Sequence, residues 1–330
     1  MIDPTQKLNP IIFDKEVEQV PIRKGFGEGL LVAGEADEKV VGLCADLTES
    51  TQMLAFAKKF PKRYVEIGVA EQNLAAVASG MAAMGKIPFI SSYAMFSPGR
   101  NWEQIRTTIC YNNQPVKIAG SHAGISVGPD GGTHQAVEDI AIMRVIPRMV
   151  VVAPCDSIEA KKATLAIAKT SDPSYLRLGR EKTPVVTTVD SPFILGKANL
   201  LRDHEAPAVA IIACGTLVHN ALVASEKLAE KGIEAIVLNL HTIKPIDTAA
   251  IIEAAKRTGA VVTCEEHQIA GGMGSAVAEV LATAAPVPIE FIGVRDLFGQ
   301  SGEPTELMEH YGMGVDAIVA ATKKVISRKK

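Results

Sequence analysis

The sequence predicts an α/β protein built from two doubly wound domains with largely parallel sheets. Short runs of β-branched and other apolar residues alternate with longer segments whose apolar residues recur at helical spacing. Strands that are apolar throughout are typical of parallel sheets buried on both faces, and the helices between them supply the crossovers. The chain has 330 residues, which exceeds one ordinary domain, so two such units are expected.

The candidate strands are spread over both halves of the chain. Most are rich in valine and isoleucine, which favour extended structure. They are 40–45 (VVGLCA), 115–120 (PVKIAG), 149–154 (MVVVAP), 208–215 (AVAIIACG), 234–240 (EAIVLNL), 260–266 (AVVTCEE) and 289–294 (IEFIGV).

Helices are expected between these strands. NLAAVASGMAAMG (73–85) places Leu74, Val77, Met81 and Met84 on one stripe, and HNALVASEKLAEKG (219–232) has a similar apolar face. The regular alternation lapses between residues 183 and 207, where proline, threonine and charged residues gather. We therefore predict that residues 1–190 form one domain and residues 191–330 the other.

Composition and charge exclude several classes of protein. The net charge is −3 and no basic stripe occurs, so no nucleic-acid partner is expected. No apolar run reaches the roughly 18 residues of a membrane span, and the first residues, MIDPTQKLNP, lack a signal-peptide pattern. We therefore expect a cytoplasmic protein that does not bind membranes.

The cysteines indicate a reducing compartment. Their number is odd, their positions are scattered through apolar strand-like runs, and no C-x-x-C spacing occurs. Buried free thiols are expected rather than disulfides or a zinc site. They are Cys44, Cys110, Cys155, Cys214 and Cys264.

The stretch GPDGGTHQ (128–135) is a candidate ligand loop. It follows a predicted strand and precedes the helical pattern QAVEDIAIMRVI (135–146). In open α/β folds ligands bind at this kind of position, because glycines let the backbone approach closely and a helix N-terminus adds partial positive charge. Asp130 and His134 would then face the ligand. Alternatively, Asp130 stabilises a turn and His134 or Thr133 caps the helix.

Two further stretches carry candidate side chains. In EIGVAEQNLAAVASG (66–80), Glu71 begins an alanine-rich helix, where a carboxylate can satisfy free N–H groups or, if buried, share a proton with a bound heterocycle. In SSYAMFSPGRNWEQIR (91–106), Tyr93, Phe96 and Trp102 gather in a chain otherwise poor in aromatic residues. Such residues either pack in the core or stack on a flat heteroaromatic ring.

The order of these stretches resembles the pyrimidine-binding domain of the transketolase family of thiamine diphosphate enzymes. VEIGVAEQN, the aromatic cluster, SHAGISVGPDGGTHQ, IPRMVVVAPCD and YLRLGREKTP follow one another as in that family. The segments 210–247 and 263–281 look like the family's C-terminal domain. The resemblance covers roughly residues 20–325 and implies a pyrimidine-binding fold followed by the transketolase C-terminal domain.

The resemblance implies roles for several residues toward the cofactor. Glu71 matches the glutamate that contacts the N1′ nitrogen of the aminopyrimidine and so makes the 4′ nitrogen a base. Tyr93 and Phe96 match aromatic residues that pack on that ring. The family's third aromatic residue falls near Gly99 or Arg100, so this side of the pocket departs from the family pattern.

The resemblance also implies a substrate site for sugar phosphates. His134 and Asp130 match residues that bind donor hydroxyls, and Asp46 matches an aspartate that lines the channel near the donor. A further group matches the cluster that holds the sugar phosphate, for which guanidinium, hydroxyl and imidazole groups are suitable donors. It consists of Arg23, Ser50, His122 and Arg180.

The family's diphosphate motif is missing, which implies a partner chain. That motif is G-D-G followed at some distance by an asparagine-containing segment, and it binds the diphosphate with a divalent metal such as Mg²⁺. GFGEG (25–29) lacks the aspartate, and the asparagine pair at 112–113 has no G-D-G before it. We expect no metal site on this chain, and a separate N-terminal subunit that completes a heterotetramer of two copies of each chain.

The function implied is reversible transfer of a two-carbon ketol unit from a ketose phosphate to an aldose phosphate. Three related enzymes are alternatives: the beta subunit of a 2-oxo acid dehydrogenase decarboxylase component, deoxyxylulose-phosphate synthase, and a split transketolase for an unusual sugar. A fourth alternative is a non-catalytic regulatory or assembly subunit. The consecutive Glu265, Glu266 and His267 resemble a site, but they follow a buried strand, and we assign them a structural role.

Overall fold

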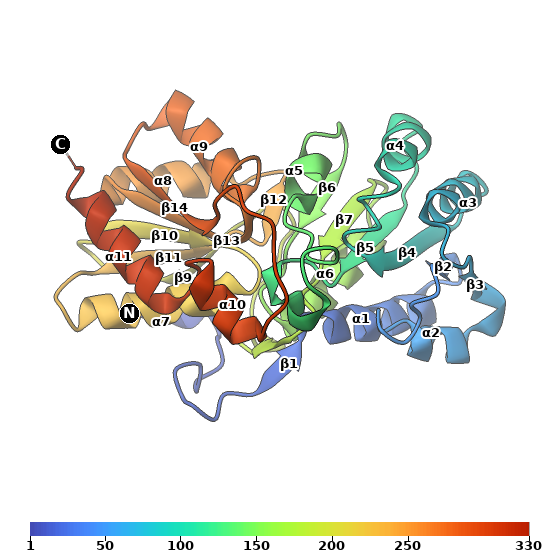
Figure 1. Ribbon diagram of the computed structural model, residues 1–330, viewed down its shortest axis with the longest axis horizontal. Helices are drawn as coiled ribbons and strands as arrows, with labels where there is room; N and C mark the ends of the chain where they lie inside the picture. Colours follow the sequence, from blue (N-terminus) through green and yellow to red (C-terminus); the bar gives the residue numbers. More distant parts are fainter. Residues whose placement is uncertain (330) are drawn as a thin grey trace.

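The computed structural model describes residues 1–329, and its larger sheet has seven strands (Figure 1). In spatial order they are β12 (Thr242–Lys244), β6 (Val150–Val152), β7 (Ser174–Arg177), β5 (Lys117–Ser121), β4 (Ile87–Tyr93), β2 (Val40–Cys44) and β3 (Tyr64–Glu66). All neighbours pair in parallel except β12 and β6. The carboxyl ends of six strands therefore lie at one edge of this sheet.

The second sheet has five strands and the same character. In spatial order they are β14 (Ile289–Val294), β13 (Val261–Gln268), β10 (Val209–Ala213), β11 (Ala235–Asn239) and β9 (Asn199–Arg202). Only β9 is antiparallel to its neighbour. A small antiparallel ribbon joins β1 (Gln19–Pro21) to β8 (Lys182–Pro184).

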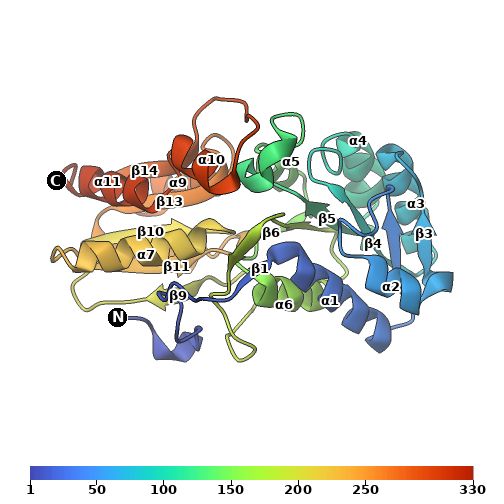
Figure 2. The ribbon, with the colours of Figure 1, turned by 60° about the horizontal axis from the view of Figure 1, so that its bottom comes forward.

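Helices cover both faces of the larger sheet (Figure 2). On one face lie α1 (Ile22–Ala36), α2 (Leu54–Lys59) and α6 (Ser157–Ala168). On the other lie α3 (Glu71–Ala83), α4 (Trp102–Gln104), the π-helix η3 (Ile105–Tyr111) and α5 (Asp139–Arg144). Short 3-10 turns are η1 (Pro4–Gln6), η2 (Pro61–Arg63) and η4 (Ile125–Asp130).

The second sheet is also covered on both faces. One face packs on α7 (Leu217–Ala229), α10 (Pro304–His310) and α11 (Val315–Ile326), and the other on α8 (Thr248–Thr258) and α9 (Met273–Ala284). One apolar core runs without a break from α3 through α5 to α9. The predicted fold class, two α/β units with largely parallel sheets, is confirmed.

Every predicted strand segment contains a strand, but seven of the fourteen strands were not predicted, namely β1, β3, β4, β7, β8, β9 and β12. β4 and β7 were missed because they carry buried polar residues such as Ser91, Ser92 and Arg177 among the apolar ones. The predicted helical stripe on α3 is partly wrong, because Met84 follows the helix and is 83% exposed. Alanines instead fill the buried face around Leu74, since they allow α3 to lie close to the sheet.

The two halves of the chain exchange segments. β12 comes from the C-terminal half but pairs with β6 in the larger sheet. At the other end of the chain, Ile2 forms a bridge with Arg202 and the Asp3 N–H donates to the Leu201 carbonyl at 3.0 Å, so the N-terminus extends the second sheet (Figure 1). The boundary at residues 190 and 191 stays a prediction.

The structure also bears on the compartment predictions. All five cysteines are buried free thiols, as predicted. Within residues 1–329, no helix has the length and apolar character needed to span a membrane.

A buried ion pair anchors the start of α5 to the larger sheet. Asp139 accepts hydrogen bonds from Arg177 Nε at 2.8 Å and from the Tyr175 hydroxyl at 2.7 Å, and its side chain is 1% exposed. Burial alone would raise the pKa of Asp139, but the Arg177 guanidinium outweighs burial and lowers it below the ordinary value. The resulting stabilisation is complete above the carboxyl pKa of the unfolded chain, about 4, and is lost as the pH falls.

Asp139→Asn is therefore expected to lower the free energy of unfolding by about 3–5 kcal/mol, because it leaves the Arg177 charge buried and unpaired. Urea denaturation at pH 7 measures this loss. The control is Asp203→Asn, which breaks the partly exposed pair with Arg257 and is expected to cost about 0–1 kcal/mol. Equal losses in the two variants would contradict the account.

Candidate active site

The predicted site residues gather at the carboxyl edge of the larger sheet. Tyr93 ends β4, His122 directly follows β5, and Arg180 lies three residues beyond β7. Glu71 starts the helix that follows β3, and Arg23 lies in the first turn of α1. This is the edge at which open α/β sheets bind ligands.

Glu71 is a buried carboxylate beside an open hollow. It is the first residue of α3 and is 2% exposed. Its Oε2 accepts a hydrogen bond from Arg100 Nη1 at 2.6 Å, and the Asn101 side chain donates to its backbone carbonyl at 2.9 Å. The carboxylate is thus held by a guanidinium rather than by free N–H groups of the helix. Residues of α3 and α4 line the hollow, which measures about 620 Å³.

The aromatic residues form a cluster with two histidines. The rings of Tyr93 and His122 stack with centroids 3.8 Å apart, and the edge of His134 meets Phe96 at 5.3 Å. Tyr93 and Phe96 lie nearly parallel at 6.3 Å. The Arg100 guanidinium lies 4.7 Å from the centre of the Phe96 ring and so links this cluster to Glu71. In the sequence, this link is indicated only by the presence of an arginine near the position expected for the family's third aromatic residue.

The guanidiniums of Arg23 and Arg180 lie near His122. Arg23 donates from Nε to the Arg180 carbonyl at 3.2 Å and from Nη1 to the Ser50 carbonyl. Arg180 Nη1 donates to the Val127 carbonyl at 2.8 Å. The predicted cluster is therefore assembled, although Ser50 contacts Arg23 through its backbone carbonyl and not through the expected hydroxyl.

Only the arginines supply positive charge to this cluster. Burial, reinforced by Arg23, Arg180 and His134, lowers the pKa of His122 to about 3, so its imidazole is neutral at physiological pH. Burial and the neighbouring Arg180 also lower the pKa of Arg23 from its very high ordinary value. Glu181 pairs with Arg180 at 2.9 Å and offsets part of the mutual repulsion of these cations, and an anion between them would offset more of it.

The glycines of the 128–135 loop serve a different purpose from the predicted one. A Cβ on Gly132 would lie 2.6 Å from the Gly299 carbonyl oxygen, and a Cβ on Gly131, whose φ is +75°, would lie 2.6 Å from Ser301 Oγ. The close approach is therefore to the segment 299–301 of the C-terminal half. At these two positions the need for glycine is explained by packing against residues 299–301, and an approach of the loop backbone to a ligand stays a prediction.

His134 does not cap a helix. α5 begins at Asp139, four residues after the expected start at residue 135, so its N-terminus begins too late to favour an anion beside His134. The N-cap residue of α5, Glu138, makes no capping hydrogen bond. His134 is partly exposed, and its Nδ1 shares a hydrogen bond of 2.9 Å with the Thr133 hydroxyl. Its Nε2 is the nitrogen left to contact a ligand.

Two predicted residues stand apart from the cluster. Asp46 has a left-handed backbone, with φ of 59°, and its N–H donates to Glu66 Oε1 at 2.7 Å. Asp130 is exposed at the tip of the loop. Neither aspartate side chain makes a hydrogen bond or ion pair with any residue between 1 and 329.

Comparison with known proteins identifies the family of this chain. The sequence profile of the transketolase pyrimidine binding domain matches residues 18–185, and that of the transketolase C-terminal domain matches residues 196–318. The chain belongs to the transketolase family, as the resemblance indicated. The family implies a transferase that depends on thiamine diphosphate.

Relatives of similar length are single sections or subunits. The putative transketolase C-terminal section of Methanocaldococcus jannaschii is 45% identical over 94% of this chain and 96% of that protein. The 6-deoxy-6-sulfo-D-fructose transketolase subunit SqwH of Clostridium sp. (strain MSTE9) is 41% identical over 96% of this chain and 98% of that protein. These relatives favour transketolase-type ketol transfer over the alternative functions.

Solved structures show the same architecture. One of them is a split gene transketolase, described as an inactive beta4 tetramer. It superposes on this chain with a TM-score of 0.88 at 43% identity, and the superposition covers 94% of this chain and 100% of that chain. The transketolase of Campylobacter jejuni shares the fold at 23% identity, with a TM-score of 0.79 over 94% of this chain and 48% of its own.

Proposed function

We propose that this chain is the C-terminal subunit of a two-chain, thiamine-diphosphate-dependent transketolase. It transfers a two-carbon ketol unit reversibly from a ketose phosphate to an aldose phosphate when a separate N-terminal subunit is present. Support comes from relatives that are themselves transketolase sections or subunits of the same length.

The observation that carries this proposal is the buried Glu71 carboxylate beside an open hollow. Arg100 occupies Oε2, whereas no donor from residues 1–329 lies within hydrogen-bond distance of Oε1. A buried carboxylate oxygen with this freedom suits a ring N–H such as N1′ of the aminopyrimidine. Tyr93 and Phe96 supply apolar ring surface nearby. The residues present therefore fit the pyrimidine end of the cofactor.

Each group then has a defined task. Glu71 holds the N1′ end of the cofactor and keeps a proton shared there, while Tyr93 and Phe96 exclude water from the ring. The cofactor supplies the carbon nucleophile and the electron sink. His134, through Nε2, and Asp130 bind donor hydroxyls, and Asp46 lines the approach to them.

The phosphate of the sugar is assigned to Arg23, Arg180, Ser50 and His122. Arg180→Ala should raise KM for a ketose phosphate by about tenfold to a hundredfold, because charge-assisted hydrogen bonds to the phosphate are lost. KM for an unphosphorylated ketose should hardly change. The control is Arg328→Ala, because this arginine pairs with Glu290 of β14 and follows the last helix, α11. A KM increase of the same size for both sugars would count against the phosphate assignment.

The diphosphate and Mg²⁺ are assigned to the N-terminal subunit, in a heterotetramer with two copies of each chain. Sedimentation analysis of the mixed chains tests this assembly, and calorimetry with thiamine diphosphate and Mg²⁺ tests the shared site. We expect cofactor binding by the mixture and not by either chain alone. Tight binding by this chain alone would contradict the shared site.

A further inference from the structure

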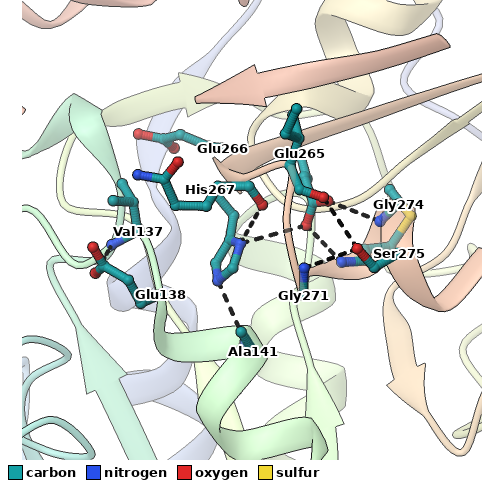
Figure 3. Close-up of polar contacts among 12 residues, drawn as sticks. Val137, Glu138, Ala141, Glu265, Glu266, His267, Gly271, Gly274 and Ser275 are labelled. Atoms are coloured by element: carbon teal, nitrogen blue, oxygen red, sulfur yellow. Dashed lines mark hydrogen bonds and ion pairs between the residues drawn. The ribbon is translucent and has the colours of Figure 1, made fainter. Parts of the chain in front are cut away.

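Three consecutive ionisable residues at the carboxyl end of β13 have no part in the function proposed above. Glu265, Glu266 and His267 are 1%, 2% and 0% exposed. Burying such groups is costly unless each finds a partner. Figure 3 shows that their side chains point in different directions, so each can be assigned separately.

Glu265 serves only the C-terminal half. Its Oε2 accepts from the Met273 N–H at 2.6 Å and its Oε1 from the Gly274 N–H at 2.8 Å, both in the first turn of α9 (Figure 3). His267 reaches into the other half, because its Nε2 accepts from the Ala141 N–H in α5 at 3.3 Å. Its Nδ1 therefore carries the proton and donates to the Gln268 carbonyl at 2.7 Å.

Glu266 contacts the segment that leads into the 128–135 loop. Its Oε1 accepts from the Ser126 N–H at 2.5 Å, and its Oε2 accepts from the Thr216 hydroxyl at 2.8 Å. Gly124, with φ of +90°, makes this contact possible, because a Cβ there would lie 2.3 Å from Glu266 Oε1. A glycine in the N-terminal half and a glutamate in the C-terminal half thus fit one another.

The C-terminal half also holds the other end of the loop. Gln135 Nε2 donates to the Gln300 carbonyl at 3.0 Å, and the Gln268 N–H donates to the Val137 carbonyl at 2.8 Å. Arg177 bridges the two halves of the chain, because its guanidinium donates to the Glu266 carbonyl at 2.8 Å and to the Ala136 carbonyl at 3.3 Å. Residues 125–135 are therefore fixed at both ends by residues of the C-terminal half.

We infer that Glu266 is a positioning residue for the loop that presents His134 to the donor sugar. A site residue must be held close to its productive geometry by supporting contacts. Among residues 1–329, the Thr133 hydroxyl is the only hydrogen-bond partner of the His134 ring. Glu266 supplies the side-chain contact that holds the loop at its Ser126 end. The inference rests on the proposed function for the role of His134, and it gives the C-terminal half a task in that function.

Glu266→Ala and Glu265→Ala form a matched pair, because both remove a buried carboxylate from the same strand end. Amide hydrogen exchange of the full chain is the first measurement. Glu266→Ala should make the amides of 124–135 exchange about tenfold faster, since the Ser126 N–H loses its partner. Glu265→Ala should leave these amides unchanged and speed exchange at the start of α9 instead.

The second measurement is ketol transfer by the pair of chains. Glu266→Ala should lower kcat about tenfold. Glu266→Gln should keep kcat close to the wild-type value, because its amide oxygen can still accept the hydrogen bond from the Ser126 N–H. If Glu266→Ala does not fold, Thr216→Val replaces it, since that change removes only the hydroxyl donor and frees the carboxylate. It should then speed exchange in 124–135 to a smaller extent.

Unchanged exchange in 124–135 in Glu266→Ala, or in Thr216→Val where Glu266→Ala does not fold, would overturn the inference, as would the same exchange pattern in Glu266→Ala and Glu265→Ala. Hydrogen exchange tests whether Glu266 positions the loop, and it does not require an active enzyme. An absence of ketol transfer in the wild-type pair would instead count against the proposed function and leave the exchange result interpretable.

Discussion

Glu71→Ala is expected to lower kcat for ketol transfer by about a hundredfold to ten-thousandfold in the reconstituted pair of chains, which is the range for loss of a positioned acid–base group. The physical reason is the loss of the one carboxylate that lines the hollow beside α3, where we propose that the pyrimidine binds. Assembly should persist, because the Arg100 side chain left behind is 48% exposed and stays hydrated.

Steady-state kinetics and sedimentation of the same samples measure the two expectations. Glu103→Gln is the control, because this carboxylate is exposed in the next helix and makes only local contacts with Gln104 and Thr107. It should keep full activity. Unchanged turnover in Glu71→Ala would reject the proton role, and loss of the complex would show that Glu71 acts in assembly.

His134→Ala is expected to lower kcat/KM for the donor ketose by about tenfold to a hundredfold, because one polar contact to the sugar is removed. Its melting temperature should change by less than about 2 °C, since His134 is partly exposed on a loop and caps no helix.

Kinetics with varied donor and a thermal melt of the same preparation test this difference. His310→Ala, an exposed histidine of α10, is the control and should alter neither quantity. A large drop in melting temperature with kcat/KM unchanged would show that His134 is structural.

The fold class was predictable because buried parallel strands leave a simple signal. Val150, Val151 and Val152 form a strand that needs no tertiary knowledge to recognise. β7 was missed because Tyr175 and Arg177 are buried against partners such as Asp139, which lie far away in the sequence. A strand whose buried polar residues pair with distant residues cannot be recognised from the local sequence pattern.

The composition of the site was more predictable than its contacts. The resemblance indicated Glu71, Tyr93 and His134, because each lies in a short motif. It gave no indication that Gly132 packs on Gly299, since that contact joins residues far apart in the chain. Arg100 was noted only as a departure from the family pattern, and its pairing with Glu71 required the structure.

The most direct test of the central claim is ketol transfer from xylulose 5-phosphate to ribose 5-phosphate with thiamine diphosphate and Mg²⁺. It is run with this chain alone, with the candidate N-terminal subunit alone, and with the two mixed. The account predicts turnover only in the mixture. Turnover by this chain alone, or a stable complex that transfers no ketol unit from any ketose phosphate, would contradict it.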